Sequence, residues 1–332
     1  MLISEGKASV TIEEAKLSRK VDGFYNPDMK LNRDIAVWIV NKLNPNSILD
    51  ANAASGIRSK RFLLETNAKN ITASDINAKL LKKNLEKTNI KILEKDSNEV
   101  MNKQYFDYID IDPFGSPVPF LESAIRSINK EGVLALTATD IGCLSGRFVK
   151  ACIRKYDSRP MPCMFANELG IRILIQKAIT VAKEQGKNLK PIFCHAGKHY
   201  YRVYLKNTKA AENLGFILLC RKCLNFYQSK NNDGVCCNKK MDYAGPLWLG
   251  SLFDKELVSD FDLIPVLKTE LNTVGYYETH YLAKKFSLPK VMKIDSCLSK
   301  LAKLNFKASK THFSPNGIKT NAKINQFKEI LS

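Results

Sequence analysis

A carboxylate, a proline and an aromatic residue follow one another in the segment Asp112-Pro113-Phe114. The lone pair of an exocyclic amine is delocalised into its base, so a catalyst has to draw that pair out before the nitrogen can attack. The Asp112 carboxylate and the Pro113 carbonyl can accept hydrogen bonds from the two N–H groups of the amine and so favour a pyramidal nitrogen. The Phe114 ring can hold a base that has flipped out of its stack. The segment suits methyl transfer to an amine, although an Asp-Pro pair also occurs in ordinary turns.

A second candidate site is the loop of residues 50–58, which consists mostly of small side chains that let the backbone approach a ligand closely. Asp75 follows 25 residues after Asp50, where an acidic side chain can accept hydrogen bonds from both hydroxyls of a ribose. This pair suits either NAD or S-adenosylmethionine, and both aspartates can instead cap helices. A NAD-dependent oxidoreductase, however, gives no reason for the Asp112-Pro113-Phe114 segment.

The elements that must position these residues are short β-rich runs alternating with helical patterns, which indicate a parallel sheet covered by helices. The five expected strands span residues 47–49, 71–73, 91–93, 108–111 and 133–136. Ligands of such sheets bind outside the carboxyl ends of the strands. Four aspartates stand at those ends, namely Asp50, Asp75, Asp96 and Asp112. We therefore expect an α/β fold with a Rossmann-like catalytic domain.

The remaining chain is expected to form a second domain. A helix is predicted over residues 168–186, because its apolar residues recur every three or four positions. The pattern changes after residue 204, and we place the domains at 1–213 and 214–332. Residues 244–250 are expected to begin a helical second half.

The C-terminal region predicts a winged-helix-like segment. Ser287 can cap a helix over residues 288–304, with Pro289 in its first turn. We expect a preceding helix at 279–286 and a following segment, 306–322, that turns at Pro315-Asn316-Gly317. The second domain is therefore expected to be α/β as well.

The chain is strongly basic, with 52 Lys and Arg against 33 Asp and Glu, a formal charge of +19 and a pI near 9.4. This balance favours a polyanionic partner such as nucleic acid, although genome composition also enriches lysine. Residues 297–332 contain seven lysines and a single acidic residue, Glu329. We expect phosphate contacts from Lys310, Lys319 and Lys323, the alternative being a solvated basic surface.

Seven short motifs, in a fixed order along the chain, together indicate a resemblance to one known family. The chain resembles the tRNA guanine-N2-dimethyltransferase family that acts at tRNA position 26. The resemblance covers nearly the whole length. Its motifs are residues 24–27 (FYNP), 31–34 (LNRD), 56–58 (GIR), 112–117 (DPFGSP), 137–140 (TATD), 244–248 (AGPLW) and 311–320 (THFSPNGIKT).

This resemblance implies a cofactor, S-adenosylmethionine, and the residues that hold it. Arg33 and Arg58 would grip the methionine carboxylate, for which arginine supplies a fork of donors. Asp75 would bind the ribose and Asp96 the adenine amine, with Asp50 in the same cofactor site.

The resemblance also implies tRNA as the substrate. Phe24 and Phe114 would flank the target guanine or the reacting methyl, and Asp112 with Pro113 would bind its amine. Phe24 can instead be a core aromatic. Two alternatives remain: an amine methyltransferase of another RNA base or position, and a non-catalytic RNA-binding protein on a decayed methyltransferase fold.

Four cysteines suggest a structural zinc site. Cys220 and Cys223 form a Cys-x-x-Cys pair, which is half of such a site. By the resemblance, Cys237 supplies a third ligand and Cys236 substitutes for the ligand expected at Gly234. The alternative is a loop without metal.

The N-terminal residues lack the apolar core of a secretory signal, and no apolar run approaches the roughly 18 residues that span a bilayer. The nine cysteines are an odd number in a long chain without such a signal. We therefore expect a cytoplasmic protein with reduced thiols, no membrane association and no stable protein partner.

Overall fold

The computed structural model describes residues 1–12, 25–210 and 212–331. The chain divides into two compact units. The first comprises Met1–Thr139, Ala178–Lys190 and Gly197–Ala210, and the second comprises Asp140–Lys177, Pro191–Ala196 and Ala211–Ser332. The functional boundary expected near residue 214 stays a prediction.

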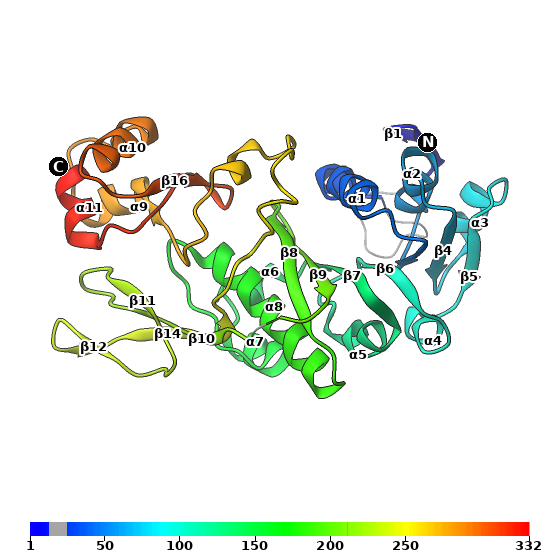
Figure 1. Cartoon of the computed structure of the whole chain (residues 1–332), viewed down its shortest axis with the longest axis horizontal. Helices are drawn as coiled ribbons and strands as arrows, with labels where there is room; N and C mark the ends of the chain where they lie inside the picture. The colour runs from blue at the N-terminus through cyan, green and yellow to red at the C-terminus, as the bar shows by residue number, and fades with distance from the viewer. Residues whose placement is uncertain (13–24, 211, 332) are drawn as a thin grey trace. The chain divides into compact units, whose positions relative to one another are not determined.

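A mixed sheet of seven strands lies mostly in the first unit (Figure 1). Its strands are β3 (Ser47–Ala51), β4 (Asn70–Asp75), β5 (Lys91–Glu94), β6 (Phe106–Ile111), β7 (Ile128–Ala138), β8 (Leu189–Ala196) and β9 (Tyr201–Asn207). They lie in the order β5-β4-β3-β6-β7-β9-β8. Strands β3 to β7 are parallel, and β9 runs antiparallel to β7. The five predicted strands are therefore confirmed.

Helices cover both faces of this sheet. They are α1 (Lys30–Leu43), α2 (Ile57–Glu65), α3 (Lys79–Leu85), α4 (Ser97–Met101) and α5 (Val118–Ser127). In Figure 1, α1 and α2 lie on one side of the strands and α4 and α5 on the other. A hairpin of β1 (Leu2–Glu5) and β2 (Ala8–Thr11) and a 3-10 helix, η1 (Pro27–Met29), precede α1. Helix α8 (Ala166–Glu184) confirms the helix predicted over 168–186.

The second unit contains small sheets and short helices. Its elements are α6 (Ile141–Leu144), α7 (Val149–Tyr156), β10 (Leu214–Leu219), β11 (Phe226–Ser229), β12 (Val235–Cys236), β13 (Lys239–Lys240), β14 (Asp242–Trp248), η2 (Pro265–Lys268), β15 (Tyr277–Glu278), α9 (Thr279–Lys285), α10 (Ile294–Lys303), β16 (Ala308–Thr311), β17 (Ser314–Thr320) and α11 (Ile324–Leu331). The sheets are ordered β11-β10-β14, β12-β13 and β15-β17-β16. Buried Leu282, Leu301, Ile318 and Phe327 form the core of the C-terminal part.

The expected helix at residues 244–250 is wrong, because residues 244–248 lie in β14, which pairs with β10. Gly245 has a φ of +131°, and Pro246 has no backbone N–H to donate to a helix. The apolar residues that suggested a helical face are buried in the sheet instead.

The helix expected over 288–304 is shorter than predicted, since α10 begins at Ile294. Ser287 has a φ of +52°, which a helix N-cap does not adopt. It closes α9 instead: its N–H donates to the Lys284 carbonyl, and the Leu288 N–H donates to the Ala283 carbonyl over 2.9 Å. This is a Schellman C-terminus, so Ser287 ends one helix rather than starting the next.

The turn expected at residues 315–317 is also wrong, because these residues lie in β17. The chain reverses at His312 and Phe313, and Thr311 pairs with Ser314. A Cβ added at Gly317 would lie 2.5 Å from Thr311 Cγ2. This glycine therefore permits close packing rather than a turn.

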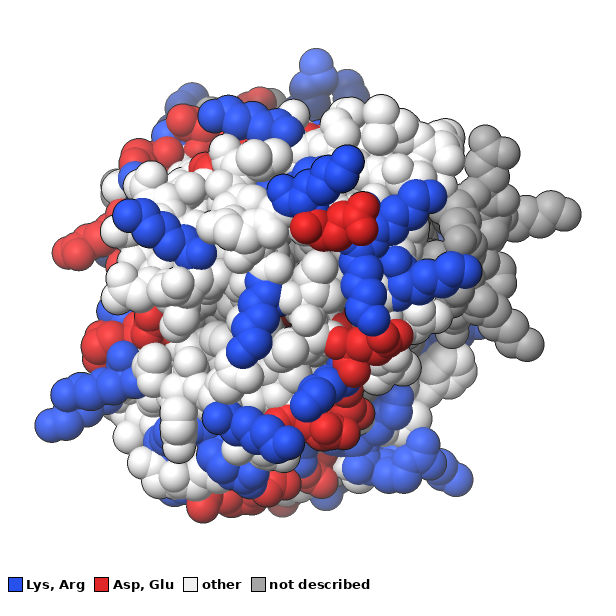
Figure 2. Space-filling view, turned by 90° about the vertical axis from the view of Figure 1, so that its right-hand side faces the viewer, with Lys and Arg blue, Asp and Glu red and all other residues white. Residues whose placement is uncertain are grey.

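Charge on the face drawn in Figure 2 is mixed. Lys and Arg side chains are scattered over it, with Asp and Glu among them. One exposed pair joins Lys82 Nζ to Glu94 Oε2 over 2.5 Å. Among the described residues drawn in Figure 2, basic side chains are interrupted by acidic ones and do not form a continuous stripe. Within the described ranges, no helix combines the length and apolar character needed to cross a bilayer.

Candidate functional site

A cavity of about 250 Å³ opens at the carboxyl ends of β3, β4 and β6 in the first unit. Parallel strands end at one edge of a sheet, so the loops that follow them meet there. The lining residues are Tyr25, Asn26, Met29, Arg33, Asp50, Asn52, Ala53, Ala54, Ser55, Ile57, Arg58, Asp75, Ile76, Asp112, Pro113, Phe114 and Thr139. Seven predicted cofactor and catalytic residues are thus brought to one place.

The loop after β3 forms one wall through unusual backbone conformations. Asn52, Ala54 and Gly56 all have positive φ values, of 62°, 49° and 77°. A Cβ at Gly56 would also lie 2.9 Å from Leu81 Cδ1, which adds to the preference of the positive φ for glycine before α2. The Ala54 N–H donates a 2.8 Å hydrogen bond to Asp75 Oδ2. Asp75 therefore shapes this loop as well as facing the cavity.

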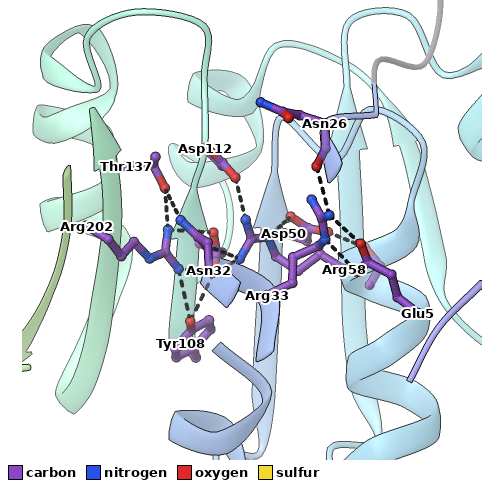
Figure 3. Close-up of polar contacts among 12 residues, drawn as sticks. Glu5, Asn26, Asn32, Arg33, Asp50, Arg58, Tyr108, Asp112, Thr137 and Arg202 are labelled. Atoms are coloured by element: carbon purple, nitrogen blue, oxygen red, sulfur yellow. Dashed lines mark hydrogen bonds and ion pairs between the residues drawn. The ribbon is translucent and has the colours of Figure 1, made fainter. Parts of the chain in front are cut away.

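Arg33 is held by the carboxylate of Glu5, which was not among the predicted site residues. Its Nε and Nη2 donate to the two oxygens of Glu5 over 2.8 and 2.5 Å, and Nη2 also donates to the Asn26 carbonyl. Burial raises the Glu5 pKa, but hydrogen bonds from Arg33 and Tyr25 outweigh it and lower that pKa overall. Glu5 is therefore a charged partner of Arg33 (Figure 3).

Arg58 lies among three carboxylates of the same site. Its Nη2 donates to Asp112, its Nη1 lies 3.5 Å from Asp110 Oδ2, and its Nε lies 4.0 Å from Asp50. Nη1 also donates to Asn32 Oδ1 over 3.0 Å. The Arg58 guanidinium is therefore paired inside the protein before any ligand arrives.

A buried arginine from β9 completes this cluster. Arg202 donates to both oxygens of Asp110 over 3.0 and 2.5 Å, and to Thr137 Oγ1 over 2.8 Å. Burial raises the Asp110 pKa, but Arg202 and Arg58 outweigh it and lower that pKa overall. Sequence reasoning missed both residues, because Arg202 lies far along the chain in a strand and Asp110 alternates with apolar neighbours within β6.

Asp50 is a cavity carboxylate whose pKa is raised by burial. It is buried and accepts a 2.5 Å hydrogen bond from Ser59 Oγ. Burial raises its pKa to about 7, against the opposing effect of Arg58. Asp50 thus exchanges its proton near neutral pH.

The Asp112-Pro113-Phe114 loop is held at the rim of the cavity by its neighbour Thr139. The Gly115 N–H donates to Thr139 Oγ1 over 2.7 Å, and the Thr139 N–H donates to the Gly115 carbonyl over 2.8 Å. Gly115 has a φ of +86°, which favours glycine. The side chain of Asp112 is 19% exposed, and Phe114 is 56% exposed. This loop can therefore present a carboxylate and an aromatic face to a planar ligand.

Other predicted site residues lie elsewhere. Asp96 caps α4 by accepting a 2.7 Å hydrogen bond from the Asn98 N–H, and it does not line the cavity. Phe24 falls outside the described residues. Lys310 pairs with Asp295 over 2.7 Å, and Lys323 is exposed.

The predicted phosphate contact from Lys319 is contradicted by its burial. Its side chain is 1% exposed, and its Nζ lies 3.1 Å from Glu168 and 3.6 Å from Glu270. A phosphate group in solvent does not reach this ammonium.

The four predicted cysteines form one cluster in the second unit. The Sγ atoms of Cys220, Cys223, Cys236 and Cys237 all lie within 4.8 Å of one another. Cys237 and Asn238 both have positive φ values, as in a two-residue hairpin turn, and this turn follows Cys236 directly. Backbone N–H groups of the Cys220–Cys223 segment outweigh the effect of burial and lower the Cys220 pKa to about 7. These donors have the chemistry of a zinc site.

Comparison with known proteins agrees with this geometry. Residues 6–332 match the family "TRM: N2,N2-dimethylguanosine tRNA methyltransferase". The tRNA (guanine(26)-N(2))-dimethyltransferase of Pyrococcus abyssi is 35% identical over 376 residues, covering 99% of this chain and 98% of that protein. The tRNA (guanine(26)-N(2)/guanine(27)-N(2))-dimethyltransferase of Aquifex aeolicus is 35% identical over 381 residues, covering 99% and 94%.

A solved structure, Trm1 from Pyrococcus horikoshii in complex with S-adenosyl-L-methionine, covers 100% of both chains. It is 32% identical, with a TM-score of 0.90. The α/β architecture is therefore that of a solved methyltransferase over the full length. The chain belongs to the N2,N2-dimethylguanosine tRNA methyltransferase family.

Proposed function

We propose that this chain transfers methyl groups from S-adenosylmethionine to the N2 amine of guanine 26 in cytoplasmic tRNA, giving N2-methyl- and N2,N2-dimethylguanosine. Family membership over residues 6–332 supports the reaction, and relatives named for position 26 support the target base. The observation that carries the proposal is the placement of Asp112 at the rim of the cavity that Asp50 and Asp75 also line.

Three aspartates and two arginines line the cavity. This balance suits S-adenosylmethionine, which carries two cationic groups, an ammonium and a sulfonium, and one carboxylate. Asp50 accepts from the ammonium, and Asp75 accepts from the ribose hydroxyls. Arg33 and Arg58 donate to the carboxylate while still paired to Glu5 and Asp112.

Asp96 would bind the adenine amine through its second oxygen, since Oδ1 already accepts from the Asn98 N–H. The Lys95 N–H donates to the Asp75 carbonyl over 3.1 Å, which fixes the chain immediately before Asp96.

The cofactor supplies an electrophilic methyl group on a sulfonium. Asp112 and the Pro113 carbonyl accept the two N–H bonds of the guanine amine and favour the pyramidal nitrogen, whose lone pair then forms the new N–C bond. As that bond forms, the S–CH3 bond would break and its electron pair would stay on sulfur, which leaves as a neutral thioether. Asp112, whose charge would stabilise the nitrogen as it becomes positive, would accept one amine proton and pass it to solvent, to which its side chain is partly exposed. Exposed Phe114 holds the flipped base by stacking, and Phe24 would contact it from the other side.

The second unit would position tRNA through its C-terminal part. In this part a short strand, β15, precedes the helix pair α9 and α10, and the hairpin of β16 and β17 comes after the helices. This order is in keeping with a winged-helix-like segment. Exposed Lys323 and half-exposed Lys310 would contact phosphates. The functional boundary remains near residue 214. The four-cysteine cluster would hold one structural zinc that fixes the β12–β13 hairpin.

The test is nucleoside mass spectrometry after incubating the protein with methyl-labelled cofactor and a tRNA transcript. A matched transcript with adenine at position 26 is the control. Label in N2-methylguanosine and N2,N2-dimethylguanosine of the first transcript alone is expected. Label found in the control transcript would show that the protein methylates another position. Nuclease mapping of the labelled tRNA distinguishes methylation at position 26 from methylation at position 27. Absent label, together with no protection against heating by the cofactor, would instead indicate a non-catalytic RNA-binding protein.

A further inference from the structure

A hydrogen-bonded network beneath the cavity joins Arg202 to Arg58 by two routes (Figure 3). In the first, Asp110 lies between the two guanidinium groups. In the second, Arg202 donates to Thr137 Oγ1, Asn32 Nδ2 lies 3.5 Å from the same oxygen, and Asn32 Oδ1 accepts from Arg58. The two arginines are thus linked directly through Asp110 and indirectly through Thr137 and Asn32.

The two contacts of Asp110 are unequal in strength. Arg202 binds both of its oxygens in the forked geometry, whereas Arg58 Nη1 stands 3.5 Å from Oδ2. All of these side chains are buried, where an unpaired carboxylate is costly. Arg202 therefore satisfies the Asp110 charge and leaves Arg58 free to point Nη2 at Asp112 and the cavity.

We propose that Arg202 is a positioning residue that keeps Arg58 oriented toward the cofactor carboxylate and Asp112. Without Arg202, Asp110 keeps Arg58 as its remaining cation, and the Arg58 guanidinium turns toward Asp110. That movement withdraws Nη2 from Asp112 and from the cavity. The inference rests on the proposed function, because it assigns to Arg58 the binding of S-adenosylmethionine.

The experiment measures S-adenosylmethionine affinity by calorimetry in the full-length protein, well below the unfolding temperature of each variant. Arg202→Met should weaken cofactor binding about tenfold, and Arg202→Lys, which keeps the charge, should recover part of the loss. The double variant Arg202→Met/Asp110→Asn should also recover affinity, because no buried charge then pulls on Arg58.

A cycle with Arg58→Met tests whether Arg202 acts through Arg58. Once Arg58 is gone, adding Arg202→Met should cause little further loss of cofactor affinity. The matched control is Arg172→Met, which breaks a fully buried arginine–glutamate pair in the second unit. It should lower the unfolding temperature without changing cofactor affinity.

Unchanged affinity in folded Arg202→Met would overturn the inference, and so would equal losses with and without Arg58. Should Arg202→Met not fold, Arg202→Lys and the double variant decide the question. A double variant that binds the cofactor more weakly than Arg202→Lys would contradict the inference, because removing the Asp110 charge should restore the orientation of Arg58. Failure of the wild-type protein to bind S-adenosylmethionine would instead reject the proposed function, so the two failures are distinguishable.

Discussion

Lys319 Nζ lies 3.1 Å from Glu168 Oε2 and donates a 2.7 Å hydrogen bond to the Thr273 carbonyl, inside the second unit. Lys319 lies between two buried glutamates, Glu168 and Glu270, so removing it takes away a cation that both carboxylates share and leaves Glu168 with Arg172 alone. Lys319→Met should therefore lower the free energy of unfolding by about 3 kcal/mol. Its tRNA affinity, measured by filter binding on folded protein, should match that of the wild type.

The control for that prediction is exposed Lys323. Lys323→Ala should leave the unfolding temperature unchanged, weaken tRNA binding and reduce the salt dependence by about one unit of log–log slope. A folded Lys319→Met that binds tRNA as weakly as Lys323→Ala would contradict the interior role of Lys319.

Asp112→Asn separates catalysis from binding. Asparagine keeps the size and one acceptor oxygen, but it loses the negative charge that stabilises the amine as positive charge develops. The single-turnover rate of methyl transfer should fall by roughly a hundredfold or more, with tRNA affinity little changed. Methyl transfer at the wild-type rate would reduce the Asp112-Pro113-Phe114 loop to an element that merely seats the base.

Cofactor binding should depend on pH through Asp50, whose pKa is raised to about 7 by burial. The cofactor ammonium favours the ionised carboxylate, so affinity should rise with pH up to about 7, and binding at pH 6 should release about one proton. Calorimetry in two buffers of different ionisation enthalpy measures this release. Asp50→Asn should abolish it, and an unaltered release in that variant would assign the proton to another group.

The raised pKa of Asp50 should also make the free energy of unfolding depend on pH. The folded state holds the Asp50 proton more tightly than the unfolded chain, whose aspartate has a pKa of about 3.9. The resulting stabilisation is present below pH ~4 and is lost as the pH rises toward 7.

The cysteine cluster predicts one zinc for each chain. Elemental analysis of purified protein should find it, and the double variant Cys220→Ser/Cys223→Ser should release it. A matched control is Cys297→Ser, at a buried cysteine outside the cluster, which should retain the metal. Metal-free wild-type protein would indicate that the close thiols occur without an ion.

Five of the seven strands could be predicted, because they are β-rich runs between helical patterns, with an aspartate at the ends of four of them. Strands β8 and β9, which make the sheet mixed, were not predicted. The same pattern placed Asp50, Asp75 and Asp112 at one edge, and all three line the cavity. Asp96 follows the same rule but caps α4, since the pattern places a residue at a strand end without fixing where its side chain points.

The partners of the two cavity arginines could not be predicted, because ion pairs between distant segments leave no local pattern. Glu5 lies in an N-terminal hairpin, and Arg202 is 92 residues from Asp110. Lys319 illustrates the converse, because a lysine in a basic tail gives no sign that two glutamates surround it. The β14 strand was mistaken for helix because short apolar runs suit either state.

The pairing of Arg33 with Glu5 and of Arg58 with Asp112 has a consequence for turnover. Each cofactor molecule donates one methyl, so a dimethylated guanine needs the spent cofactor to leave and a fresh one to enter. In the proposed site, the cofactor carboxylate would meet two arginines whose charge Glu5 and Asp112 already share, and this sharing would weaken the binding of the carboxylate. When the carboxylate departs, those acids keep both guanidinium groups compensated, so product loss leaves no bare buried cation. In the proposed reaction, the paired arginines would therefore suit rapid exchange of cofactor between the first and second methyl transfer.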